Sequence, residues 1–119
     1  MGKKGEIMKI ALLALTALAF VSFGQYFEIT NDTGYDVYFV YISESSDDSF
    51  GEDWLGSDIM YDGDTYEFDV SDLNWETELF DIQLEDVDGD TYTFFGVDGE
   101  EYGSGDGENI FTVTLSDID

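Results

Sequence analysis

The stretch TELFDIQLEDVDGDTYTFFG, residues 77–96, decides the fold, because it contains two apolar strands and the turn that joins them. Residues 77–87 alternate apolar and polar side chains, and residues 90–96 are rich in the aromatic and threonine residues that strands favour. Between them lie Asp88 and Gly89, and an Asp-Gly pair accepts the positive φ angles of a type I′ turn. We therefore expect an antiparallel hairpin with a type I′ turn.

The same alternation separates a core face from a solvent face. In residues 77–87 the apolar face carries Phe80, Ile82 and Leu84. The polar face carries Asp81, Gln83 and Glu85. Residues 35–42, YDVYFVYI, are instead apolar on both faces, which predicts a central strand.

Short apolar stretches separated by Asp, Gly, Ser and Asn continue along the rest of the chain, which contains no Pro. The predicted strands lie near residues 25–31, 35–43, 58–61, 65–70, 77–87, 90–96 and 109–116. About seven strands without helical periodicity predict an all-β fold, a small antiparallel β-sandwich that is immunoglobulin-like or C2-like.

Antiparallel order through all these strands would sort the connections into two ends. One end would carry the tight turns at 31–34, 61–65 and 88–89. The other end would carry the long loops at 44–57, 71–76 and 97–108. These long loops are rich in Asp and Glu, so we expect carboxylates to converge at their end of the sandwich.

Residues 8–25, MKIALLALTALAFVSFGQ, have the pattern of a secretory signal peptide. Lys9 precedes an apolar run, and Ser22 and Gly24 are small residues before a cut at Gln25. This pattern predicts that the mature protein is secreted, periplasmic or on the cell surface.

The predicted organisation is therefore a signal segment over residues 1–24 and an acidic β-sandwich domain over residues 25–119. An alternative is that the Lys-Lys-Gly sequence before Glu6 resembles a prepilin-type cleavage site. In that case the chain would be a filament or pilin-like subunit.

Charge excludes several partners. The basic residues Lys3, Lys4 and Lys9 all lie in the leader, and there is no Arg or His. Of the 29 acidic residues only Glu6 precedes Gln25, so the remaining 95 residues carry 28 acids and a formal charge of −28. Binding to nucleic acid or to an anionic membrane surface needs Lys or Arg, so we expect neither partner.

Catalysis is also disfavoured by composition. Without His or Cys the chain has no Ser-His-Asp or Cys-His machinery and no thiolate or imidazole zinc site. Paired carboxylates can hydrolyse glycosides, but among 28 acids a suitable spacing arises by chance. We expect that the chain is not an enzyme.

Residues 31–33, Asn-Asp-Thr, fit an N-glycosylation sequon.

Asp86, Asp88 and Asp90 form the first half of a calcium-loop pattern. An EF-hand loop would need Gly after the third acid and Glu at position twelve, but Gly89 precedes Asp90 and position twelve is Val97. The EF-hand interpretation fails. The hairpin explains this stretch better, with the aspartates as further candidate ligands.

The acidic long loops are the stronger candidates for a calcium site, because hard cations prefer six to eight oxygen ligands. The candidate ligands, hairpin included, are Asp47, Asp48, Glu52, Asp53, Asp98, Glu100, Asp106, Asp86, Asp88 and Asp90. Diffuse counterion dependence of a solvated acidic surface is the alternative. In either case the predicted partner is a divalent cation, with calcium as the cofactor, or high salt.

Three motifs resemble those of small secreted bacterial domains that share a Trp/Phe-Gly-x-Asp-x-Leu-Gly stretch, an acidic Gly turn and an Asp-x-Asp-Gly-Asp-x-Tyr hairpin. The matching residues are Phe50, Gly51, Asp53, Leu55 and Gly56, then 62–64, then 86–92 and 96–98. The resemblance implies a β-sandwich and export. It implies no activity.

Two function classes follow from these observations. The first is a non-enzymatic secreted or surface structural domain that calcium or salt stabilises. The second is a carbohydrate- or protein-binding module that uses the loop aromatics Trp54, Trp75 and Tyr102. Its protein or glycan partner is not specified by the sequence. An exposed flat row of aromatic rings would favour the second class.

Overall fold

The computed structural model describes residues 25–75, 77–102 and 110–119. These residues form β1 (Tyr26–Asp32), β2 (Val37–Glu44), β3 (Thr65–Asp69), β4 (Leu79–Asp86), β5 (Thr91–Asp98) and β6 (Phe111–Thr114). A single helical turn, α2 (Gly99–Tyr102), follows β5, and a 3₁₀ turn, η2 (Leu115–Asp117), follows β6. The all-β class is therefore confirmed, whereas the predicted signal segment lies outside the described residues.

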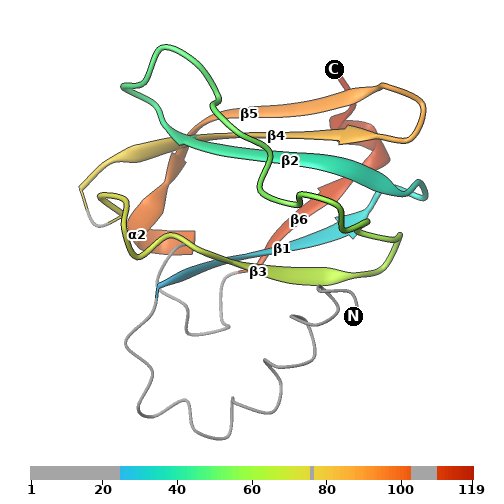
Figure 1. Ribbon diagram of the computed structural model, residues 1–119, viewed down its shortest axis with the longest axis horizontal. Coiled ribbons are helices and arrows are strands. Elements are labelled where there is room, and N and C mark those ends of the chain that lie inside the picture. Colours follow the sequence, from blue (N-terminus) through green and yellow to red (C-terminus); the bar gives the residue numbers. More distant parts are fainter. Residues whose placement is uncertain (1–24, 76, 103–109) are drawn as a thin grey trace, which may run out of the picture.

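The strands form two three-stranded sheets, with orders β3-β1-β6 and β2-β4-β5. Figure 1 shows the sheets as two layers, with β2, β4 and β5 above β1, β3 and β6. All strand pairs are antiparallel except β1 and β6, which run parallel. The parallel pair arises because β5 ends where β1 begins, so the next strand returns in the direction of β1.

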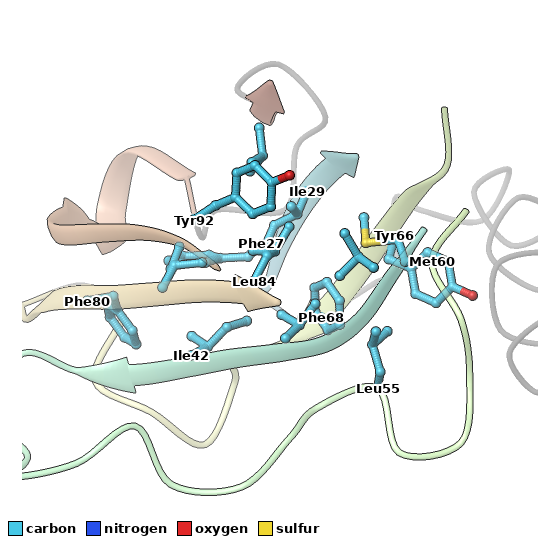
Figure 2. Packing of buried hydrophobic residues seen from close by; sticks show 14 of the residues in the cluster. Phe27, Ile29, Ile42, Leu55, Met60, Tyr66, Phe68, Phe80, Leu84 and Tyr92 are labelled. Atoms are coloured by element: carbon cyan, nitrogen blue, oxygen red, sulfur yellow. The ribbon is translucent and has the colours of Figure 1, made fainter. Parts of the chain in front are cut away.

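The core lies between the layers. Phe80, Ile82 and Leu84, predicted to share the inner face of β4, are all fully buried. Phe27 of β1 meets Phe80 edge to face across the layers, with ring centroids 5.2 Å apart. Figure 2 shows Phe27, Phe80 and Leu84 among the buried side chains that pack between the two sheets. Full burial of such a side chain contributes about 1.5–3 kcal/mol, so this alternation stabilises the sandwich.

β2 is an edge strand, so the prediction of a central strand over residues 35–42 is wrong. The free edge of β2 is covered by the loop before β3 and not by another strand. The backbone N–H of Trp54 donates to the Val40 carbonyl at 2.7 Å, and Val37 and Met60 exchange two backbone hydrogen bonds. This single bridge is all that the structure has of the strand expected at 58–61.

Among the described residues, the tight turns gather at one end of the sandwich, as antiparallel order predicts, whereas residues 103–108 of the third long loop lie outside them. The β1–β2 turn, the start of β3 and the β4–β5 hairpin share one end, because Thr30 pairs with Thr65 and Val37 pairs with Asp86. The β2 exit and the β3–β4 loop share the other end, where Glu44 Oε2 accepts a hydrogen bond from Asn74 N at 2.9 Å. The long loop after β2 runs from this second end back to the first.

Asn31, the first residue of the sequon, is completely buried. Its amide nitrogen donates to the carbonyls of Tyr35 at 2.8 Å and Met60 at 2.9 Å. The folded domain therefore uses this side chain to join the turn to the loop and does not present it for glycosylation.

No helix within the described ranges is long and apolar enough to cross a membrane.

Candidate cation site at the β4–β5 hairpin

The hairpin between β4 and β5 has a three-residue loop. Asp86 N donates to the Asp90 carbonyl at 2.9 Å, and Gly89 N donates to the Asp86 carbonyl at 2.9 Å. Gly89 has a φ of 83°, and no residue other than glycine has a positive φ in the part of the chain that the structure describes. The hairpin is confirmed, but the type I′ turn is wrong, because that turn requires a positive φ at Asp88 as well.

The side chain of Asp86 explains this geometry. Its Oδ1 accepts hydrogen bonds from the backbone N–H groups of Asp88 at 2.9 Å and Asp90 at 3.0 Å. Its Oδ2 accepts the hydroxyl of Tyr92 at 2.8 Å. Asp86 is only 2% exposed, and burial of a carboxylate is costly unless it is hydrogen-bonded in this way. The first aspartate of the motif is thus a structural element of the loop.

The hydroxyl of Tyr92 supports the Asp86 carboxylate from inside the core. Tyr92 is fully buried, and its hydroxyl donates to Asp86 Oδ2 at 2.8 Å. Burial, and then the hydrogen bond to Asp86, raise the pKa of Tyr92 to about 12. The phenol therefore stays protonated and keeps donating to the Asp86 carboxylate.

The three aspartates of the hairpin come together. One carboxylate oxygen from each of Asp86, Asp88 and Asp90 lies within 4.8 Å of the other two. Two ligands of one calcium ion are at most about 5 Å apart, because each lies 2.3–2.6 Å from the ion. Asp88 and Asp90 are exposed, so water can complete the coordination shell. This arrangement suits a hard cation at the surface of the hairpin.

The acidic residues of the long loops do not form such a group within the described ranges. Asp47, Asp48 and Glu52 are exposed in the loop after β2, and Glu100 is exposed in α2. Asp106 lies outside the described residues. The hairpin is the one place where three described acidic side chains approach closely enough to share an ion.

Two of the predicted loop ligands have structural roles instead. The Asp53 carboxylate accepts hydrogen bonds from the backbone of Val40 at 2.9 Å, Leu55 at 3.0 Å and Gly56 at 3.0 Å. It thereby fastens the long loop to the edge of β2. Asp98 Oδ1 accepts a hydrogen bond from Glu100 N at 2.9 Å, at the start of α2.

The loop aromatics proposed as a ligand platform pack against the core. Trp54, Trp75 and Tyr102 are all partly buried against the hydrophobic cluster. The Trp54 ring meets Phe68 edge to face at 6.3 Å, and Tyr102 meets Phe111 at 5.3 Å. These three rings therefore anchor loops to the sandwich.

Sequence reasoning missed two surface features. Glu28 and Glu67 are directly opposite each other on β1 and β3. Partial desolvation on the sheet surface, and then a hydrogen bond with Glu28 and the charge of Glu28, raise the pKa of Glu67 to about 7. Predicting this pair would have required the register of β1 against β3, which places the two carboxylates opposite each other. The second feature is a row of aromatic rings on the outer face of the β2-β4-β5 sheet. It was missed because the apolar residues on both faces of 35–42 were interpreted as a central strand.

Comparison with protein-family models, with curated proteins and with solved structures found no match to this chain. The class that the fold and the site define is an acidic β-sandwich with a carboxylate-rich hairpin. The resemblance to small secreted bacterial domains stays a prediction.

Proposed function

We propose that this chain is a non-enzymatic structural domain, exported to the periplasm, the cell surface or the medium, that bound cations stabilise. The observation that carries the proposal is the cluster of Asp86, Asp88 and Asp90, with one oxygen from each within 4.8 Å. The sequence from Gln25 onward contains no Lys, Arg or His to balance these charges. Export rests on the leader sequence, residues 8–25.

Calcium is the proposed ion at the hairpin. All three candidate ligands are carboxylates, and calcium binds oxygen ligands in a flexible geometry. Asp86 is held by its hydrogen bonds, so the site is partly organised before the ion arrives. Asp88 and Asp90 are exposed, and a bound ion would offset the repulsion between their two negative charges.

Strand order supports an immunoglobulin-like sandwich as the finer fold. In that fold one sheet has the order C-F-G and strands B and E pair in the other sheet. The order β2-β4-β5 corresponds to C-F-G, and the antiparallel pair β1-β3 corresponds to B and E. The parallel pairing of β6 with β1 is the departure from this pattern.

The test of the cation site is calcium titration by isothermal calorimetry of the chain from Gln25 to Asp119. The double variant Asp88→Asn, Asp90→Asn removes two candidate ligands and keeps Asp86, which the loop needs. The matched control, Asp47→Asn, Asp48→Asn, removes the same charge from exposed positions in the long loop after β2.

We expect the hairpin variant to lose calcium binding at least tenfold and the loop variant to bind within about twofold of the wild type; a tenfold change is 1.4 kcal/mol. Equal weakening in both variants would show that calcium responds only to net charge. The structural domain would then depend on diffuse counterions.

A further inference from the structure

Four aromatic rings form a continuous row on the outer face of the β2-β4-β5 sheet. Phe39 and Tyr41 of β2 lie with ring centroids 6.3 Å apart and planes 8° apart. Tyr41 is followed by Phe50 of the long loop at 6.2 Å, and Phe50 is followed by Phe95 of β5 at 6.5 Å. The row therefore runs along β2 and then across the sheet to β5.

This row is solvent-accessible. Phe95 is 74% exposed and Phe39 is 37% exposed, whereas Tyr41 and Phe50 are half-buried. Single exposed apolar residues are normal on protein surfaces, but contiguous exposed apolar patches commonly mark interaction sites. Phe50 has a local role as well, because its ring holds the long loop against the sheet.

Carboxylates border the row on both sides of β2. Glu85 of β4 lies directly opposite Phe39 in the strand register. Asp53 lies at the free edge of β2, where its carboxylate accepts a hydrogen bond from Val40 N at 2.9 Å. The pKa of Tyr41 is raised by burial and then by the negative charges of Asp53 and Glu85, which agrees with this proximity.

We propose that this aromatic row is a docking surface for an extended, arginine-bearing segment of another protein. An arginine side chain stacks on aromatic faces and pairs with carboxylates, and the row offers both groups side by side. Charge complementarity selects this occupant, because the domain carries 28 acidic residues and no basic ones from Gln25 onward. A second copy of the chain would bring the same negative charge against itself.

The ring spacing fits an extended segment. Side chains on one face of an extended chain recur every second residue, about 6.6 Å apart. The three centroid spacings in the row, 6.3, 6.2 and 6.5 Å, match this repeat. Along β2, arginines at alternate positions would therefore meet the neighbouring rings of Phe39 and Tyr41.

The test uses a seven-residue peptide with arginine at alternate positions and serine between them, titrated by calorimetry in about 0.15 M NaCl, where long-range attraction is screened. The row variant is Phe39→Ala, Phe95→Ala, which leaves the loop anchor Phe50 in place. The matched control, Tyr35→Ala, Tyr61→Ala, removes two rings that are 42% and 50% exposed and lie outside the row. Melting temperatures establish that each variant is folded, and Phe95→Ala alone replaces the double variant if that one unfolds.

We expect the row variant to bind the peptide about fivefold to thirtyfold more weakly, since each exposed cation–π contact is worth about 0.5–1 kcal/mol. We expect the control to bind within twofold of the wild type, and a citrulline version of the peptide not to bind. No binding of the arginine peptide, or equal binding by the row variant and the control, would overturn the proposal. A neutral glucan hexasaccharide that binds the row in place of the peptide would overturn the charge argument and identify a glycan site.

Discussion

At the scale of single residues, Asp86 links the hairpin to the core. Its buried carboxylate receives two backbone N–H groups of the loop and the hydroxyl of Tyr92. A three-residue loop places the N–H groups of Asp88 and Asp90 around one oxygen, and this explains why the loop departs from a two-residue turn. The alternating aspartates therefore have two roles, since the first shapes the loop and the other two extend into solvent.

Gly89 tests the loop conformation. Its φ is 83°, and a Cβ added there would meet no atom within 4 Å. The cost of Gly89→Val therefore comes from the backbone alone, and we expect about 1–3 kcal/mol of lost stability in urea unfolding. The control is Asp88→Val, which puts the same side chain on a neighbouring exposed residue with negative φ. Equal stabilities for the two variants would contradict the left-handed conformation at Gly89.

At the scale of elements, the β1–β3 pair holds two carboxylates together. The pKa of Glu67 is raised from 4.5 to about 7, chiefly by partial desolvation and then by Glu28. Between these two pH values the folded chain holds a proton at Glu67 that the unfolded chain has released. This group therefore favours folding most below about pH 4.5, and its contribution is lost as the pH rises towards 7.

The variant Glu67→Gln removes this titration while keeping a hydrogen-bonding side chain. We expect the variant to gain stability relative to the wild type as the pH rises from 4.5 to 7, in urea unfolding at several pH values. Glu52→Gln, an exposed change of the same charge in the long loop, is the control. A stability difference for Glu67→Gln that does not vary with pH would contradict the raised pKa of Glu67.

The elements also show how far the sequence predicts the structure. Alternation correctly assigned the buried face of β4 to Phe80, Ile82 and Leu84, because one sheet face is apolar and the other polar. The same reasoning failed for β2, whose outer face carries Phe39 and Tyr41 in partial contact with solvent. A local pattern cannot distinguish rings covered by another strand from rings that form a surface row.

The candidate site was predictable only in part. The sequence identified Asp86, Asp88 and Asp90 as alternating acids, and their spacing along the chain suffices because they share one hairpin. The sequence analysis preferred the long loops as the calcium site. That preference required separate loops to lie close together in space, and spacing along the sequence does not give this distance. Asp53 illustrates this point, since its carboxylate binds three backbone N–H groups of β2 and its own loop.

At the scale of the whole molecule, electrostatic repulsion opposes folding. The residues from Gln25 onward carry 28 acids and no basic side chain, and a compact domain of about 100 residues has a radius of gyration of only ~13 Å. Screening acts over about 8 Å at physiological ionic strength, so charges interact across much of the domain. Added salt relieves this repulsion generally, whereas calcium at the hairpin would stabilise the folded chain specifically.

The central claim is tested most directly by thermal melting in calcium chloride and in sodium chloride at matched ionic strength, after treatment with EDTA. We predict a higher melting temperature in about millimolar calcium, because a ligand at a hundredfold excess over Kd adds ~2.7 kcal/mol of stability. The variant Asp88→Asn, Asp90→Asn should lose this excess, and Asp47→Asn, Asp48→Asn should keep it. Equal melting temperatures of the wild type in calcium and in sodium would contradict a specific cation site.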